Sequence, residues 1–378
     1  MPQKHTWNYT QYYSTTMIKL GIEATSLCTP NRSGIANYTF NLINALLENQ
    51  EFKTEFDLKL LYKLSRYKKR NYRYLPFEDV ARWHFNQILP LQKNTDIVHS
   101  PDSIFIDWKK PKKIVTIHDL AIYKTENQLK DYTSAEFRAK NFAFLKRVAK
   151  EADAILTVSE CTKSDFLELF DYKPEQIIVT HLGFRLPATI ASNDTLIKRF
   201  SISPKNYLLF AGLISVRKNI VNLLKAYKKS GVYQENKLVL AGSFGMGHQT
   251  IMDEITNLGI AEHVILPGFV SDTELAALYA NAKAFLFPTY YEGFGLPIVE
   301  AMTYGIPVMI GDRGAAPEIA GQHAVQVNPF DIDSISNGIV RTINTTELQI
   351  AAARAHAAQY TWNNCAQKTI KVYQSLIG

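Results

Sequence analysis

Hydrophobic residues along the chain gather in short continuous runs, and the stretches between these runs show the spacing of amphipathic helices. Apolar runs that alternate with helical patterns are typical of parallel strands covered by helices on both faces. We therefore expect an α/β fold with strands at residues 17–24, 56–62, 96–99, 113–117, 154–158, 207–212, 237–242, 264–270, 284–288 and 308–310.

This alternation is interrupted between residue 184 and about residue 205, where prolines and small polar residues replace the apolar runs. A chain of 378 residues is also long for a single hydrophobic core. We therefore place the boundary between two doubly wound, Rossmann-like domains in this interruption. The expected parts are a polar extension at 1–16, a first domain at 17–190, a second domain at 205–360 and a helical region that ends near residue 377.

One apolar run leads directly into residues 290–302, which read Tyr-Tyr-Glu-Gly-Phe-Gly-Leu-Pro-Ile-Val-Glu-Ala-Met. Gly293 and Gly295 permit a positive φ and a close approach between backbone and ligand. A helix that begins after them offers free N–H groups and a positive dipole end to a phosphate. Glu292 and Glu300 lie roughly 12 Å apart if most of the span is helical, which suits the two ends of a nucleotide-sugar. The alternative is an ordinary turn with one solvated glutamate and one at a helix N-terminus.

Two adjacent cations, Arg217 and Lys218, follow the first apolar run of the second domain and precede an amphipathic helix at 220–229. Cations at a helix N-terminus oppose the helix dipole. An anionic ligand would explain their position. The alternative is a pair of exposed surface cations.

Further candidates lie at the carboxyl ends of strands in the first domain, the edge at which open α/β sheets bind ligands. His118 and Asp119 follow the strand at 113–117. His118 is either a site residue or a core histidine, and Asp119 either orients its imidazole or caps a loop. Gly34 lies in the loop after the first strand, and this loop lacks the G-x-G-x-x-G pattern of a dinucleotide site.

The run Glu-Gly-Phe-Gly-Leu-Pro at 292–297, followed by Glu300-Ala-Met, resembles the E-x7-E signature of family-4 retaining glycosyltransferases. These enzymes have the GT-B fold, in which two Rossmann-like domains face a central cleft. The resemblance covers essentially residues 17–375. It implies that Glu292 contacts the transferred sugar, that Glu300 contacts the ribose, and that His118 faces the sugar from the opposite wall.

The same resemblance implies the rest of the site. Many members carry the arginine of the Arg-Lys pair several residues earlier, where this chain has Leu213. The final helix, at about 361–378, is expected to cross back to the first domain, and Phe269 or Val270 to lie near the base. Catalytic roles are expected for His118 and Glu292, and donor binding for Gly34, Arg217, Lys218, Gly293, Phe294, Gly295, Leu296 and Glu300.

The Arg-Lys-Asn string and the Gly-Ile-Ala-Asn-Tyr loop look most like mannosyltransferases of bacterial surface polysaccharide and lipopolysaccharide assembly, which use GDP-mannose. A UDP-hexose or UDP-N-acetylhexosamine donor is the alternative. The acceptor is expected to be a saccharide or a lipid-linked saccharide. The alternatives of another class are a non-catalytic nucleotide-sugar- or polyanion-binding protein and a sugar-nucleotide epimerase. Asp331-Ile332-Asp333 has the D-x-D pattern with which the other class of glycosyltransferases binds metal, but here it opens a helix and is expected to cap it. We therefore expect no catalytic metal. We also expect no cofactor.

Lys and Arg exceed Asp and Glu by 42 to 35, a net charge of +7. Residues 63–73 hold six of the cations and no acid, which fits either a solvated loop or a docking surface for anionic lipid. No recognition motif for nucleic acid is present. We expect no secretion leader, because no charged-then-apolar stretch is present, and no apolar run approaches the roughly 18 residues of a membrane span. The three cysteines lack disulfide or metal spacing. We expect a cytoplasmic protein, peripheral on the inner face of the cytoplasmic membrane if its acceptor is lipid-linked.

Overall fold

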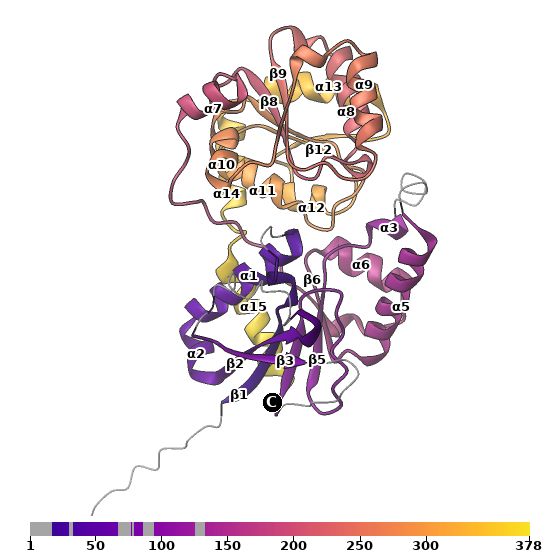
Figure 1. Cartoon of the computed structure of the whole chain (residues 1–378), viewed down its shortest axis with the longest axis vertical. Coiled ribbons are helices and arrows are strands. Elements are labelled where there is room, and N and C mark those ends of the chain that lie inside the picture. Colours follow the sequence, from indigo (N-terminus) through magenta and orange to yellow (C-terminus); the bar gives the residue numbers. More distant parts are fainter. Residues whose placement is uncertain (1–16, 30–32, 67–76, 78, 86–93, 125–132) are drawn as a thin grey trace, which may run out of the picture.

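A computed structural model describes residues 17–29, 33–66, 77, 79–85, 94–124 and 133–378. Two fully parallel sheets form two lobes, and helices cover both faces of each sheet (Figure 1). The expected α/β fold of two Rossmann-like domains is therefore confirmed. Most of the basic segment at 63–73, and the extension at 1–16, lie outside the described residues.

The first lobe contains a seven-stranded sheet of order β3-β2-β1-β4-β5-β6-β7. Its strands are β1 (Ile18–Glu23), β2 (Phe56–Lys63), β3 (Ala81–Phe85), β4 (Ile97–Ser100), β5 (Lys112–Ile117), β6 (Ala154–Thr157) and β7 (Ile177–Val179). Its helices are α1 (Gly34–Glu48), α2 (Gln50–Glu55), α3 (Ala121–Lys124), α5 (Ala135–Glu151) and α6 (Glu160–Leu169).

The second lobe contains a six-stranded sheet of order β10-β9-β8-β11-β12-β13. Its strands are β8 (Tyr207–Ala211), β9 (Lys237–Ala241), β10 (Val264–Gly268), β11 (Ala284–Phe287), β12 (Val308–Gly311) and β13 (Val325–Val327). The remaining helices are α7 (Asn193–Phe200), α8 (Ile220–Lys229), α9 (His248–Asn257), α10 (Asp272–Asn281), α11 (Leu296–Thr303), α12 (Ala316–Ala320), α13 (Ile332–Ile343), α14 (Glu347–Ala357) and α15 (Trp362–Ser375).

The structure differs from the sequence-based expectation in one connection. The interruption at 184–205 contains α7, which belongs to the second lobe because Arg199 forms an ion pair with Glu274 of α10. Near the C-terminus a turn at 358–361 separates α14 from α15, which corresponds to the final helix expected at about 361–378. Thr361 begins α15, since its side chain accepts a hydrogen bond from the N–H of Asn364.

The final helix crosses back to the first lobe, as expected (Figure 1). In α15 the Tyr373 hydroxyl lies 2.7 Å from Nδ1 of His99 in β4. The two segments that join the lobes run against each other, because the Phe184 N–H donates to the Tyr360 carbonyl at 3.0 Å. A Cβ atom on Gly183 would lie only 2.0 Å from the Trp362 nitrogen, so only glycine permits this approach.

Among the helices that the structure describes, none combines the length and the apolar character that a membrane-spanning helix needs. The same residue ranges contain no group of three or more His, Cys, Asp and Glu side chains arranged to hold a metal ion.

Candidate active site

The strand order of the second sheet reverses between β8 and β11, and open α/β sheets bind ligands outside the carboxyl ends of strands at such a point. The chain leaves β8 into a 3₁₀ turn, Val216–Lys218, and leaves β11 into the glycine-containing turn before α11. Lys218 and Glu292 meet there. The Lys218 Nζ donates to both carboxylate oxygens of Glu292, at 2.6 and 2.8 Å.

This ion pair is almost completely buried, with 11% of the Lys218 side chain and 9% of the Glu292 side chain exposed. Burial lowers the pKa of Lys218, while the adjacent Glu292 carboxylate favours its charged form. The interpretation of both cations as exposed surface residues is therefore wrong for Lys218. Arg217 is half-buried, and its guanidinium donates to the Tyr291 carbonyl at 3.4 Å.

Asn219 holds the two turns together, although sequence reasoning did not single it out. Its amide donates to the carbonyl oxygens of Pro288, at 2.9 Å, and Pro329, at 2.6 Å. Its φ of 60° places it in the left-handed region, which asparagine tolerates better than most residues. The asparagine that directly follows two cations was the available signal.

The two glycines of the signature turn differ in their roles. Gly295 has a φ of +90° and precedes the first turn of α11, whose N-terminus has no side-chain cap. Gly293 has no positive φ, contrary to expectation. A Cβ atom at Gly293 would lie 1.9 Å from the carbonyl oxygen of His118, so this glycine permits contact between the lobes. Because α11 begins only at Leu296, the span from Glu292 to Glu300 is helical in its second half alone.

Phe294, the residue between the two glycines, is buried, with 5% of its surface exposed. Its ring packs edge-on against Tyr360, with centroids 5.7 Å apart. The side chain therefore contributes to packing at this turn.

A cavity of about 400 Å³ lies beside α11, and Leu296, Glu300, Tyr279 and Tyr304 line it together with residues of α1. The Tyr304 hydroxyl is buried and has no hydrogen-bond partner. Burial raises the pKa of Glu300 to about 7, while a hydrogen bond from the Tyr279 hydroxyl acts in the opposite direction. A carboxyl group and an unpaired hydroxyl group at one cavity suit a ligand that carries several hydroxyl groups.

His118 follows β5 on the first lobe. Its Nε2 lies 2.8 Å from the Pro101 carbonyl, which can only accept, so Nε2 carries a proton. Burial lowers the pKa of His118, and the neutral ring therefore keeps its lone pair on Nδ1. Asp119 caps the following loop, because its Oδ1 accepts from the Ala121 N–H at 3.1 Å. It does not orient the imidazole.

A buried hydrogen-bond network supports the histidine from behind. The Tyr38 ring packs edge-on against His118, with centroids 4.7 Å apart. The Tyr38 hydroxyl lies 3.2 Å from Thr116 Oγ1, which lies 2.8 Å from Nε2 of His99. Since His99 also bonds Tyr373, the network links α15 to the ring behind His118.

Three side chains at the start of α6 and within it join the lobes at this site. Ser159 caps α6, and its hydroxyl also donates to the Gly293 carbonyl at 2.6 Å. Thr162 donates to the same carbonyl at 3.2 Å, and the Tyr291 hydroxyl donates to the Asp165 carboxylate. The structure therefore places His118 and the turn that carries Glu292 in direct contact.

Glu318 joins the two lobes. From α12 of the second lobe it accepts the N–H groups of Glu160 and Cys161, both at 2.9 Å, at the N-terminus of α6. His181 contacts the same carboxylate at 2.9 Å. Burial opposes ionisation, but these hydrogen bonds lower the pKa of Glu318 overall. We call the contact between Glu318, the α6 N-terminus and His181 the interlobe clamp.

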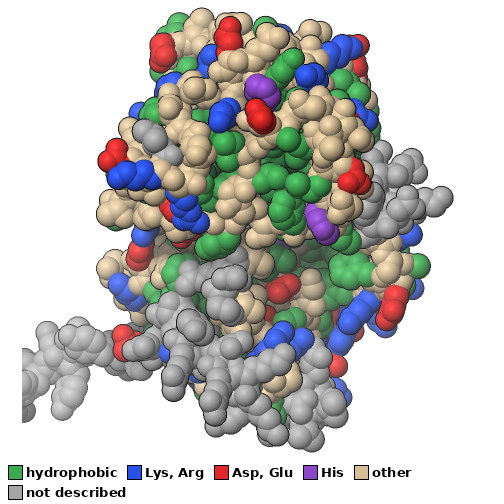
Figure 2. All heavy atoms as spheres, turned by 45° about the horizontal axis from the view of Figure 1, so that its top comes forward, with side chains coloured by type: hydrophobic (Ala, Val, Ile, Leu, Met, Phe, Trp, Pro, Cys, Tyr) green, Lys and Arg blue, Asp and Glu red, His purple; other side chains and the backbone are tan. Residues whose placement is uncertain are grey.

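The other predicted positions are more exposed. Gly34 is the first residue of α1, and no atom lies within 4 Å of the position of an added Cβ. The Phe269 side chain is 68% exposed. Asp331 caps α13 as expected. Figure 2 shows hydrophobic side chains gathered on the upper lobe where it borders the lower lobe.

The sequence matches two glycosyltransferase family models. The one described as Glycosyltransferase Family 4 matches residues 8–186, and the one described as Glycosyl transferases group 1 matches residues 193–359. The chain is 30% identical to O-antigen chain mannosyltransferase B of Escherichia coli, over 77% of each chain. It is 31% identical to the MMP alpha-(1->4)-mannosyltransferase of Mycolicibacterium hassiacum, over 61% of this chain and 56% of that one.

Solved structures share the fold at low sequence identity. Sucrose-phosphate synthase from Thermosynechococcus elongatus superposes with a TM-score of 0.73 at 15% identity, over 95% of this chain and 99% of that one. HepE from Anabaena, in complex with UDP and glucose, gives a TM-score of 0.71 at 17% identity, over 95% and 100% of the two chains. The chain therefore belongs to the family-4 glycosyltransferases of the GT-B fold and is similar to their mannosyltransferases.

Proposed function

We propose that this glycosyltransferase transfers mannose from GDP-mannose, with retention of configuration and without a metal ion, to a saccharide or lipid-linked saccharide in the assembly of a surface polysaccharide or lipopolysaccharide. Its similarity to enzymes named as mannosyltransferases supports the donor. The observation that carries the reaction type is the buried Lys218–Glu292 pair at the switch point of the second sheet, in contact with the His118 loop through Gly293.

In the proposed reaction, the bond between the sugar C1 and the donor diphosphate breaks. A bond forms on the same face of C1 to an acceptor oxygen, and the departing phosphate takes the acceptor's proton. Lys218, Arg217 and the N-terminus of α11 stabilise the negative charge that develops on the diphosphate. Glu292 binds sugar hydroxyl groups, and the Nδ1 lone pair of His118 accepts a hydrogen bond from the same sugar.

The cavity beside α11 would receive the ribose. Glu300 accepts hydrogen bonds from ribose hydroxyl groups in its ionised form, and the unpaired Tyr304 hydroxyl offers a further partner. Gly34 at the start of α1 and the turn residues from Gly293 to Leu296 complete the proposed donor site.

Two parts of the proposal concern location and partner. The enzyme would be cytoplasmic, and the basic segment at 63–73 would hold it on the anionic inner face of the cytoplasmic membrane when its acceptor is lipid-linked. A UDP-hexose is the second candidate donor, because the structural neighbour HepE was solved with UDP and glucose.

The test is thermal stabilisation of the protein by GDP, GDP-mannose, UDP and UDP-glucose, each measured alone. A rise in melting temperature with the guanine ligands alone is expected, followed by transfer of labelled mannose to an acceptor extract. A rise with the uracil ligands alone would replace the donor, and no rise with any of the four would reject a nucleotide-sugar enzyme. The anomeric configuration of the product, read by NMR, tests retention.

A further inference from the structure

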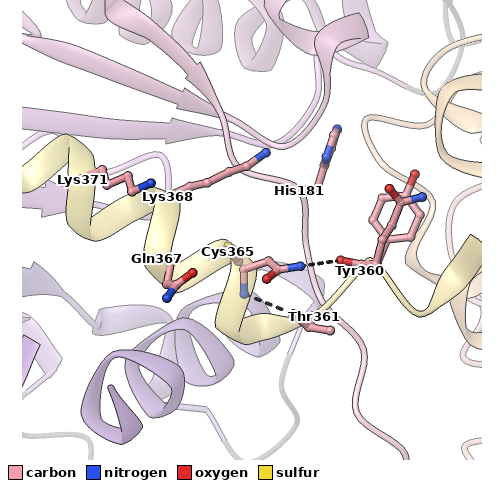
Figure 3. A pocket seen from close by; sticks show the side chains of 9 residues that line it. His181, Tyr360, Thr361, Cys365, Gln367, Lys368 and Lys371 are labelled. Carbon is pink, nitrogen blue, oxygen red and sulfur yellow. Dashed lines mark hydrogen bonds between the residues drawn. The ribbon is translucent and has the colours of Figure 1, made fainter. Parts of the chain in front are cut away.

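The two chain segments that join the lobes border a cavity that the proposed reaction does not use. This hinge cavity has a volume of about 300 Å³. His181, which follows β7, forms one wall, and residues 359–361 between α14 and α15 form a second. The third wall is the face of α15 that carries Lys368 and Lys371 (Figure 3).

The residues that line the hinge cavity include two lysines and a histidine but no carboxylate. Lys368 and Lys371 are exposed and lie about one turn apart on α15, and Figure 3 shows Lys368 extended toward His181. Lys368 Nζ lies 3.5 Å from the Val179 carbonyl, at the outer limit of a hydrogen bond. Within the described ranges neither lysine forms an ion pair. The two lysines therefore offer uncompensated positive charge, whereas Nε2 of His181 is paired with the Glu318 carboxylate.

The position of the hinge cavity connects it to the arrangement of the lobes. Its wall at 359–361 contacts the other connecting segment through the Phe184–Tyr360 hydrogen bond. His181 belongs to the interlobe clamp, because its Nε2 lies 2.9 Å from the Glu318 carboxylate. A ligand that contacts His181 and residues 359–361 would therefore touch both connecting segments and one partner of the clamp.

We propose that the hinge cavity binds a small phosphate-bearing anion, and that this binding favours the arrangement of the lobes in which the interlobe clamp is formed. Lysine side chains offer only hydrogen-bond donors, so the ligand must supply acceptor oxygens and negative charge. A phosphate group has enough oxygens to contact Lys368 and Lys371 together while it lies beside His181, whose Nε2 is bonded to Glu318. The hinge cavity shares no lining residue with the cavity beside α11.

Isothermal titration of the full chain with inorganic pyrophosphate, without divalent ions and at fixed ionic strength, tests this site. We expect binding to the unchanged protein and a loss of about tenfold in affinity for each of Lys368→Gln and Lys371→Gln, because each variant loses a charged hydrogen-bond donor. The matched control is Lys146→Gln with Lys150→Gln, two exposed lysines about one turn apart on α5. This control pair should bind pyrophosphate as the unchanged protein does.

Pyrophosphate also resembles the diphosphate of the proposed donor, so Arg217→Gln separates the two sites. The Lys368/Lys371 variant carries both Lys368→Gln and Lys371→Gln. Binding that survives Arg217→Gln and is lost in this double variant supports the hinge cavity. Binding lost only in Arg217→Gln overturns the hinge site and supports the donor site instead. Absence of binding at millimolar concentrations, or equal losses in both lysine pairs, also overturns the hinge site.

Small-angle scattering tests the link to the arrangement of the lobes. Pyrophosphate should reduce the radius of gyration of the unchanged protein and leave that of the Lys368/Lys371 variant constant. An unchanged radius in both proteins, or an equal decrease in both, overturns this link.

Discussion

Replacing Lys218 by methionine isolates the energy of the buried ion pair. Methionine keeps the length of the side chain but removes its charge, which leaves the Glu292 carboxylate 9% exposed and without its partner. Loss of one member of a buried ion pair costs about 3–5 kcal/mol, because the remaining charge is desolvated without compensation. We expect Lys218→Met to lower the free energy of unfolding of the second lobe by about that amount.

The double variant Lys218→Met with Glu292→Gln removes both charges. It should be more stable than Lys218→Met alone, and the coupling energy of the cycle should reach about 2–3 kcal/mol. Neither protein should transfer sugar, so recovery of stability without recovery of activity separates the structural role of the pair from its proposed role in the reaction.

The chain offers an internal way to follow each lobe. Its four tryptophans lie outside residues 205–360. In urea, tryptophan fluorescence therefore follows the first lobe, and far-UV circular dichroism follows both. Lys218→Met should shift the unfolding transition that circular dichroism reports for the second lobe. It should leave the transition that fluorescence reports unchanged. The reasoning is refuted if the losses of stability in the single variants Lys218→Met and Glu292→Gln add up to the loss in the double variant. A loss below about 1 kcal/mol for Lys218→Met would refute it as well.

Three further changes test the surroundings of the pair. Gly293→Ala would place a Cβ atom 1.9 Å from the His118 carbonyl. Turnover should therefore fall by about 100-fold or more, while the circular dichroism spectrum stays unchanged. Near-normal turnover would contradict the close contact between Gly293 and His118. Burial raises the pKa of Glu300 from 4.5 to about 7. Between these two pH values the folded protein keeps a proton that the unfolded chain releases. The free energy of unfolding therefore falls by up to about 3 kcal/mol as the pH rises through this window. Glu300→Gln should remove that part of the slope in melting experiments from pH 4.5 to 8, and an unchanged slope would assign it to other groups. Glu318→Gln removes the negative charge from the N-terminus of α6, so scattering should report a larger radius of gyration, whereas the adjacent Glu160→Gln should leave it unchanged.

The ten predicted strands are all present, because long apolar runs leave few alternatives to a buried parallel strand. The sequence did not predict β3, β7 and β13, and each of these lies at an edge of its sheet. Edge strands bury less surface and need fewer apolar residues, as in the Ala-Arg-Trp-His-Phe sequence of β3. Helix α7 was missed for a related reason, since a short helix among turn-forming residues has little periodicity.

The structure joins candidate site residues through contacts that the sequence did not predict. Lys218 and Glu292 were singled out from separate motifs and given separate ligands, but their ion pair joins positions 74 residues apart. Such a contact depends on the order of β8 and β11 in the sheet, which no local pattern encodes. The same limit applies to Gly293, because the His118 carbonyl that it accommodates comes from the other lobe.

The ion pair also makes a prediction about donor recognition. A diphosphate that takes the Lys218 ammonium must compete with Glu292, and a nucleoside diphosphate offers nothing to replace the lost contact of that buried carboxylate. The hexose of a complete nucleotide-sugar can replace it with hydroxyl donors. Leaving a buried charged acceptor unpaired costs more than about 1–3 kcal/mol, so GDP-mannose should bind about tenfold or more tightly than GDP in calorimetric titrations. In Glu292→Ala the carboxylate is absent, and this preference should shrink or reverse. Equal affinities of the unchanged protein for the two ligands would mean that Lys218 keeps its bond to Glu292 when the donor binds, and Arg217 with the N-terminus of α11 would then have to hold the diphosphate alone.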